Sequence, residues 1–428
     1  MLQIFFLVFL SHVPMHCVAN SEIRLPRLGD ATSGIVSLEQ EYQIGRTWLK
    51  AFRSRIREHQ DPILKLYLEQ LLNSLANHSQ LKDPRLELVI INNPSINAFA
   101  VPGGIVGVHT GIFIHAKTED ELSSILAHEL AHLSQRHFAR GVEAQRQTSL
   151  LSMGGLLAGL AIAAAAGADA GTAAMTVSQA AAMEGSLRYS RSNEQEADRI
   201  GLQTMKAANR NPRAAAEMFE TMLSITRHSI NRPPEFLLTH PVTEKRIADA
   251  RNRTMNTSLK HYPPGEKYLL MQSRAITGLS NDPNTVIKNF NLKLRQRVLN
   301  SDAINYGLTL AHMRKNDLAS AKQLISVLIA NNPEQLIFRH TDIEIDVASE
   351  RLKSAEAKVD TLLKKNPTSY PLLLLKSEVF LKRKKYHQSS ELLYFLTKHR
   401  PADPNIWYRL AEVNGLAGDI AGVHKARA

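Results

Sequence analysis

The chain has 428 residues, which is long for one domain and suits two or three. Apolar residues make up 44% and charged residues 21% of the sequence, as is usual for folded soluble proteins with a sizeable core. The net charge of +12 gathers near the C-terminus, where residues 260–428 hold 26 Lys and Arg against 16 Asp and Glu. No nucleic-acid-binding motif accompanies this charge. We therefore expect a solvated surface, or an acidic partner or peripheral membrane contact, and no nucleic acid.

The N-terminus has most features of a secretory signal peptide. Its apolar run, residues 4–10, is too short to span a bilayer, and small residues precede a plausible cleavage site before Asn20. No Lys or Arg precedes the run, so a buried N-terminal strand is the alternative. Cleavage would remove Cys17, the only cysteine, and would exclude disulfides, thiolate metal sites and a thiol nucleophile in the mature chain.

The next segments predict helices around a small sheet. Residues 36–80 carry apolar side chains at helical spacing. Residues 85–113 contain short apolar runs separated by Asn-Pro and Pro-Gly-Gly, which predict two or three strands. Thr118 and Glu121 then form a capping box ahead of apolar residues at mostly helical spacing, so a helix is expected to begin there.

A segment rich in alanine and glycine follows. Residues 150–168 include no charged side chain and are long enough to raise the question of a transmembrane helix. Because Ala and Gly are only weakly lipid-seeking, we favour a buried helical hairpin or a lid over a membrane span.

The C-terminal part is periodic. Pro333, Pro367 and Pro401 are spaced 34 residues apart, which is typical of tetratricopeptide helix pairs. Residues 335–352 match this pattern poorly. The fourth repeat ends at Ala428, a few residues into its second helix, so the chain is a fragment or a partner covers that end.

These patterns predict a mostly α protein. We expect a signal peptide over residues 1–19 and a helical domain with a small β-sheet over residues 20–262. An α-solenoid of tetratricopeptide repeats follows over residues 263–428, with its last repeat incomplete.

The sequence HELAH places two histidines on the helix that begins near Thr118. His128 and His132 are four residues apart, so both imidazoles lie on one face and can bind one tetrahedral Zn²⁺. Glu129 projects beside them and could take a proton from a zinc-bound water. The alternative is a solvated helix with two surface histidines, but the residues flanking the pair are apolar.

A zinc site of this type needs a third ligand. The metzincin pattern would place Gly and His where this chain has Gln135 and Phe138, so that class is excluded. His137 is nine residues after His128 and would lie on the opposite side of a continuous helix, so we expect it to stay outside the site.

The best candidate for the third ligand is Glu194 in the sequence NEQEAD. Asp198 lies one turn later and could accept the remaining N–H of a ligand histidine. Glu196 is expected to face solvent. The alternative is an acidic first helical turn that complements the helix dipole.

A second cluster, THPVTEKR, contains His240 and Arg246. Either residue could stabilise the transition state, and His240 could instead be an additional ligand that must move aside. Helix-start chemistry at Thr239 and Pro241 is the alternative.

Taken in order, NAFAVPGGIVGVHTGIF, HELAH, EQEAD and THP with Arg246 resemble the gluzincin metallopeptidases that include the CAAX-processing proteases. A signal peptide and a repeat array point to the bacterial periplasmic branch. The resemblance implies one zinc ion held by His128, His132 and Glu194, with Glu129 as catalytic base. It also implies that residues 97–104 supply an edge strand for extended substrate. The residues concerned are Asn97, Ala98, Phe99, Ala100, Gly103 and Gly104.

The resemblance further implies a periplasmic endopeptidase that hydrolyses misfolded or stalled outer-membrane barrel proteins and could assist their assembly. The repeats would dock substrate or the assembly machinery. Two alternatives stay open: a repeat-based chaperone or scaffold with a latent peptidase domain, and an integral-membrane peptidase that uses residues 150–168 as its span.

Overall fold

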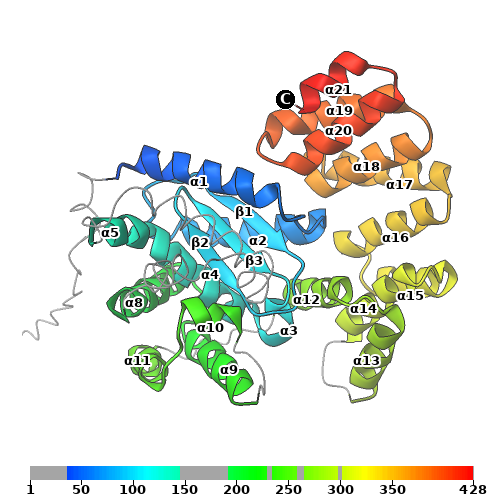
Figure 1. Cartoon of the computed structure of the whole chain (residues 1–428). Coiled ribbons are helices and arrows are strands. Elements are labelled where there is room, and N and C mark those ends of the chain that lie inside the picture. Colours follow the sequence, from blue (N-terminus) through cyan, green and yellow to red (C-terminus); the bar gives the residue numbers. More distant parts are fainter. Residues whose placement is uncertain (1–35, 145–190, 229–233, 258–264, 297–300, 428) are drawn as a thin grey trace, which may run out of the picture.

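The structure is a computed structural model, and it describes residues 36–144, 191–228, 234–257, 265–296 and 301–427 (Figure 1). The expected signal peptide (residues 1–19) and the alanine-rich residues 150–168 lie outside these ranges. Among the described helices, none is both long and apolar enough to cross a bilayer.

The first part of the chain surrounds a small sheet with helices. Its strands are β1 (Glu87–Ile91), β2 (Ala98–Val101) and β3 (Ile105–His109), in the order β1-β3-β2. β1 runs parallel to β3, and β2 runs antiparallel to it. The helices are α1 (Leu38–Arg53), α2 (Pro62–Ala76), α3 (Ile112–His115), α4 (Glu119–Ser134), α5 (His137–Ala144), α8 (Arg191–Ala207), α9 (Ala214–His228), α10 (Glu235–Thr239) and α11 (Glu244–Thr254).

The expected helices over residues 36–80 and strands within residues 85–113 are confirmed. Strand side chains alternate between faces and nearly every strand residue is buried, so the sheet is buried on both sides. One face packs on α1 through Trp48 and Phe52, and the opposite face belongs to the main core that includes α2 and α4. Packing against the sheet therefore fixes the position of α4 within the core.

Two glycines form the turn between β2 and β3. Gly103 and Gly104 have φ angles of +79° and +81°, which side chains other than glycine rarely adopt. A Cβ on Gly104 would also lie 1.9 Å from the carbonyl oxygen of Arg85. This turn leaves β2 at the edge of the sheet.

Helix α4 begins at the expected cap. The Thr118 side chain accepts a hydrogen bond from the Glu121 backbone N–H at 3.1 Å. The Glu121 carboxylate accepts from the backbone N–H of Lys117, so the cap is extended by one residue toward the N-terminus. Nearly every residue of α4 is buried, which excludes the alternative of a solvated helix with surface histidines.

The rest of the chain is an array of helix pairs. The helices are α12 (Glu266–Leu279), α13 (Pro283–Gln296), α14 (Ser301–Arg314), α15 (Leu318–Asn331), α16 (Leu336–Ala348), α17 (Leu352–Lys365), α18 (Tyr370–Lys382), α19 (Tyr386–His399), α20 (Pro404–Leu416) and α21 (Ile420–Arg427). From α15 onward, alternate helices begin 34 residues apart. Although residues 335–352 match the repeat pattern poorly, they fold as α16 in step with the other repeats.

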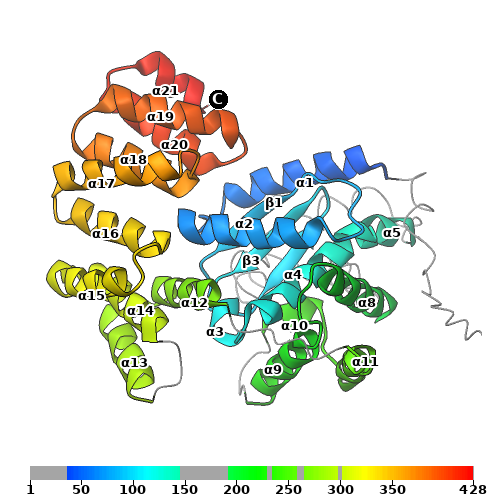
Figure 2. The same ribbon diagram turned by 180° about the vertical axis from the view of Figure 1, so that it is seen from behind.

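The array curves back toward α2 (Figure 2). Lys65 on α2 forms a buried ion pair of 2.9 Å with Asp403, which precedes α20. Arg274 on α12 links Asp61, the N-cap of α2, to Glu344 on α16. One hydrophobic cluster includes residues of α2, α4, α12, α14 and α16. The domain boundary at residues 262/263 stays a prediction, and this core extends across it.

Candidate metal centre and active site

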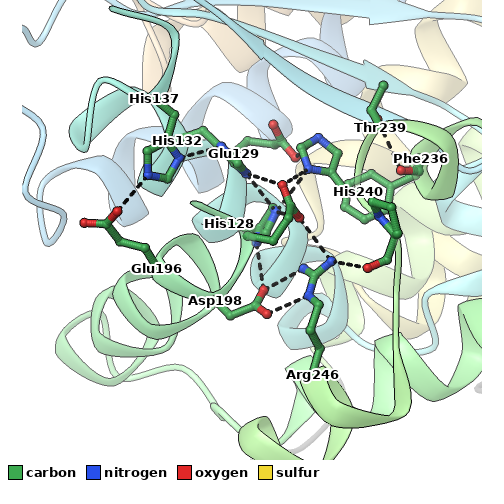
Figure 3. A network of polar contacts seen from close by, with 12 residues as sticks. His128, Glu129, His132, His137, Glu196, Asp198, Phe236, Thr239, His240 and Arg246 are labelled. Carbon is green, nitrogen blue, oxygen red and sulfur yellow. Dashed lines mark hydrogen bonds and ion pairs between the residues drawn. The ribbon is translucent and has the colours of Figure 1, made fainter. Parts of the chain in front are cut away.

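Four buried side chains converge at one point (Figure 3). His128 and His132 lie on α4, Glu194 on α8, and His240 directly follows α10. One ligand atom from each lies within 4.8 Å of the others. The Nε2 atoms of His128 and His132 are 3.0 Å apart, and His240 Nδ1 lies 3.0 Å from Glu194 Oε1. The structure thus brings together the three predicted ligands and His240.

Small residues let α8 approach α4 closely enough to share this site. A Cβ on Gly201 would lie 3.2 Å from the backbone nitrogen of His128. Ala197 packs against Ala131 in a small buried cluster. These small residues permit close packing of the two helices, and the packing brings Glu194 to the two histidines.

Asp198 and Arg246 form a second layer beneath the four side chains (Figure 3). Asp198 Oδ1 lies 3.0 Å from His128 Nδ1, as the sequence predicts for a ligand histidine's partner. Arg246 donates two hydrogen bonds of 2.7 Å to Asp198, and its Nη1 lies 3.0 Å from Glu194 Oε2. These contacts favour a positioning role for Arg246 over the expected role as an oxyanion donor.

His137 stays outside the group of four side chains, as expected, but the continuous helix assumed for it is wrong. α4 ends at Ser134, and Arg136 adopts a φ of +53°, so the helix breaks and α5 starts in a new direction at His137. The break brings His137 Nδ1 to 2.8 Å from His132 Nδ1. His137 is not one of the four convergent side chains, but it contacts one of them directly.

Contrary to expectation, the Glu196 side chain is not fully exposed to solvent. Its Oε2 lies 3.2 Å from His137 Nε2 and accepts a hydrogen bond of 2.7 Å from Arg140. His137 and Arg140 lower the pKa of Glu196 to about 2. The break between α4 and α5 could not be predicted from the residue types, because Arg136 occupies the positive-φ position at which a glycine would have signalled a break.

Glu129 lies beside the convergent side chains and is 1% exposed. Its Oε1 lies 3.7 Å from His240 Nε2. Neither carboxylate oxygen makes a hydrogen bond of normal geometry with a described residue, and the carboxylate faces the backbone N–H of Ala100 on β2. The catalytic base expected from the sequence is therefore placed between the ligand cluster and the sheet edge.

The predicted substrate strand is β2 with its flanking residues. Ala98, Phe99 and Ala100 are buried, and β2 pairs with β3 on one side only. Asn97 donates to Glu235 of α10 at 3.2 Å. The glycines at 103 and 104 lie in the turn and pack against α1 and Arg85, and their contact with substrate stays a prediction.

Burial and mutual contact set the charges in the site. Burial lowers the pKa of His132 well below its usual value. For His128, burial also lowers the pKa, but the carboxylates of Asp198 and Glu194 outweigh it and raise the pKa to about 9. Burial raises the pKa of Glu194, but the surrounding imidazoles hold it well below its usual range. Burial raises the pKa of Glu129.

The donor set fits a zinc ion. Zinc prefers imidazole nitrogens and carboxylate oxygens in four-coordinate sites, and these are the groups that converge here. Glu194 is the carboxylate of the group: its Oε2 lies 3.4 Å from His128 Nε2, and its Oε1 lies 3.4 Å from His132 Nε2 and 3.0 Å from His240 Nδ1. The histidines and Glu194 can therefore hold one metal ion per chain.

Comparisons with known proteins agree with this site. The model of peptidase family M48 matches residues 62–254, which include all four convergent side chains. The beta-barrel assembly-enhancing protease of Yersinia pestis is 30% identical over 398 residues, covering 92% of this chain and 81% of that protein. The protein of the same name from Escherichia coli strain K12 is 31% identical, covering 92% and 80%.

Two further similarities are more limited. The mitochondrial metalloendopeptidase OMA1 of Schizosaccharomyces pombe is 32% identical over 218 residues, which cover 50% of this chain and 60% of that protein. A solved structure of a tetratricopeptide repeat protein from Parabacteroides merdae is also similar, with a TM-score of 0.33 and 14% identity. The alignment covers 49% of this chain and 77% of the Parabacteroides chain. The family match and the long alignments show that the chain belongs to peptidase family M48 and is a metallopeptidase.

Proposed function

We propose that this metallopeptidase is a zinc-dependent endopeptidase of the bacterial periplasm that acts on misassembled outer-membrane barrel proteins. The observation that carries the proposal is the buried group of His128, His132, Glu194 and His240, with Glu129 beside it. The names of the relatives from Yersinia pestis and Escherichia coli, which refer to beta-barrel assembly, support the substrate class.

The proposed roles follow from the contacts. His128, His132 and Glu194 would hold the zinc, whose chemistry is to polarise the scissile carbonyl and activate a water molecule. Glu129 would hold and then transfer the proton, and burial raises the pKa of its carboxyl. Asp198 fixes the orientation of His128, and Arg246 fixes Asp198.

His240 has two proposed roles. A catalytic zinc site has three protein ligands and one position for water or substrate, whereas four protein ligands close it. With His240 Nδ1 in the group, the site would be closed, and His240 would have to move aside for catalysis. Its Nε2 near Glu129 Oε1 supports a later role near the reacting groups.

Strand addition at β2 is the proposed mode of substrate binding. β2 pairs with β3 on one side only, and α4 packs against it. An extended peptide beside β2 would run next to Glu129 without needing a particular side chain. This selects unfolded segments over folded ones. The repeats would supply a second contact with substrate or with the assembly machinery.

The first test replaces the proposed base. Glu129→Gln keeps the shape and burial of the side chain but cannot take a proton, so we expect wild-type zinc content and at least a 100-fold loss of cleavage. Zinc is measured by elemental analysis, and cleavage is measured on an unfolded outer-membrane barrel protein. Cleavage at the wild-type rate would remove Glu129 from the mechanism.

The second test addresses the ligand on α8. Glu194→Ala removes the only carboxylate in the group, so we expect loss of zinc together with loss of cleavage. Unchanged zinc content would contradict this assignment.

The same assay separates the two rival functions. A chaperone or scaffold with a latent peptidase domain would bind the unfolded protein without cleaving it, whereas the proposed enzyme cleaves it and a zinc chelator stops cleavage. A membrane-spanning peptidase would stay in the membrane fraction after carbonate extraction, and the proposed periplasmic enzyme would be released.

A further inference from the structure

We propose that His137 is a positioning residue for the metal ligand His132 and connects it to Glu196. The inference rests on the proposed zinc site. His137 is 1% exposed and lies outside the four convergent side chains, so its burial needs a separate explanation. Its two ring nitrogens face different groups, one in the site and one outside it (Figure 3).

The nitrogen contacts define one consistent arrangement of protons. If His132 binds metal through Nε2, its Nδ1 carries a proton and must donate it. His137 Nδ1 lies 2.8 Å away and can accept that hydrogen bond. His137 then carries its own proton on Nε2, which lies 3.2 Å from Glu196 Oε2. A neutral His137 satisfies both neighbours, and no additional proton is needed.

This arrangement makes α8 the source of a carboxylate for each ligand histidine. Asp198 contacts His128 Nδ1 directly at 3.0 Å, whereas Glu196 reaches His132 only through His137. Glu194 lies 3.4 Å from the Nε2 atoms of both histidines and is the proposed ligand itself. Carboxylate partners of this kind fix the tautomer and the ring orientation of a ligand histidine. His137 bridges the distance between Glu196 and His132.

The backbone conformation of Arg136 also supports this role. Its φ of +53° is unfavourable for an arginine, and the residue is buried. The Arg136 side chain donates to Glu41 of α1 at 3.0 Å and to the carbonyl of Val36, which hold the break in place. Without the break, His137 would point away from His132.

The test is the zinc affinity of the full-length chain, measured by competition with a chromogenic chelator. We expect His137→Ala to weaken zinc binding about 10- to 100-fold, the range found for partners of ligand histidines. His137→Gln should recover most of the loss, because its amide can accept from His132 and donate to Glu196. Glu196→Ala should cause a smaller loss, since it leaves His137 in contact with His132.

His340→Ala is the matched control. His340 is 3% exposed and lies on α16, away from the site, so its loss disturbs a buried histidine without touching the ligands. We expect unchanged zinc affinity for this variant. The visible absorption of the Co²⁺-loaded chain gives a second measurement, which His137→Ala should shift and His340→Ala should not.

The outcomes separate the two proposals. A wild-type chain without zinc affinity would contradict the zinc site itself. Tight zinc binding by wild type with no change in His137→Ala would overturn only the role of His137. An equal loss in His340→Ala, or no recovery in His137→Gln, would also overturn it, because the effect would then reflect general destabilisation. If His137→Ala does not fold, Glu196→Ala decides, and unchanged affinity there contradicts the connection.

Discussion

At the scale of single residues, the site depends on a glycine in α8 as much as on the side chains that converge there. Gly201 faces the backbone of α4 where His128 and Ala127 lie, and an added Cβ would lie only 3.2 to 3.3 Å from that backbone. The same close approach lets the carboxylates of α8 reach the histidines. The position therefore couples helix packing to the geometry of the ligands.

Gly201→Leu tests this coupling. Leucine is a good helix former, so any loss of stability would come from overpacking against α4, at a cost of about 1–3 kcal/mol. Urea unfolding measures the loss, and zinc affinity should fall with it. Ala207→Leu, at an exposed position on the same helix, should change stability by less than about 0.5 kcal/mol. Equal effects of the two variants would contradict a packing role.

At the scale of elements, the repeats share one strained position. Asn316, Glu350, Lys384 and Gly418 all have positive φ angles and are spaced 34 residues apart, each just before the second helix of a pair. Only the last is glycine. The turn geometry is thus kept in every repeat, although three of the four residues adopt it at a cost.

Lys384→Gly should therefore stabilise the protein by about 1 kcal/mol, because glycine adopts this conformation without strain. Thermal unfolding measures the gain. Asn316→Gly should give less, since asparagine tolerates this region better than lysine does. Lys382→Gly, two residues earlier and within α18, should instead destabilise by up to about 1 kcal/mol. A loss in Lys384→Gly would refute the strain.

The elements were predictable where the signal is local. The 34-residue prolines, the Thr118 cap and the strand turns predicted α15 to α21, α4 and the sheet. The HExxH spacing and NEQEAD predicted which side chains meet at the site. The break at Arg136 was not predictable, because it depends on contacts with Glu41 and Val36, a hundred residues away in sequence.

At the scale of the whole molecule, α2 joins the catalytic part to both ends of the array. Asp61 at its N-cap contacts Arg274, and Lys65 one turn later contacts Asp403 near the last repeats. Tyr370 also donates to Asp403. These pairings are polar and distant in sequence, so periodicity could not reveal them. They fix the array relative to the site.

Lys65→Met should destabilise the protein by about 3 kcal/mol, because it removes the cation nearest to the buried Asp403 and leaves Arg400, at 3.8 Å, as the remaining one. Arg227→Met removes an ion pair whose side chains are 64% and 82% exposed, and it should cost less than about 1 kcal/mol. Urea unfolding compares the two variants. Equal losses would contradict a special role for the contact between α2 and the array.

This contact also has a pH dependence with a definite sign. Burial raises the pKa of Asp403, but Lys65 and Tyr370 outweigh it and hold the pKa below its usual value. A lowered pKa stabilises the fold above the unfolded value of about 3.9, and the stabilisation is lost as pH falls. The difference between wild type and Lys65→Met should be largest above about pH 4 and decrease below it.

The placement of the ligands on separate helices has a consequence for the chain as a polymer. His132 and Glu194 lie 62 positions apart in the sequence, and a metal ion held by both would close the chain between them into a loop. By chain entropy, a cross-link of that length would restrict the unfolded state by about 4 kcal/mol. With Cys17 as its only cysteine, the chain cannot form an intramolecular disulfide. The ion that performs the chemistry would therefore also be the protein's cross-link, and removing it should lower the unfolding temperature of a catalytically dead Glu129→Gln chain as well.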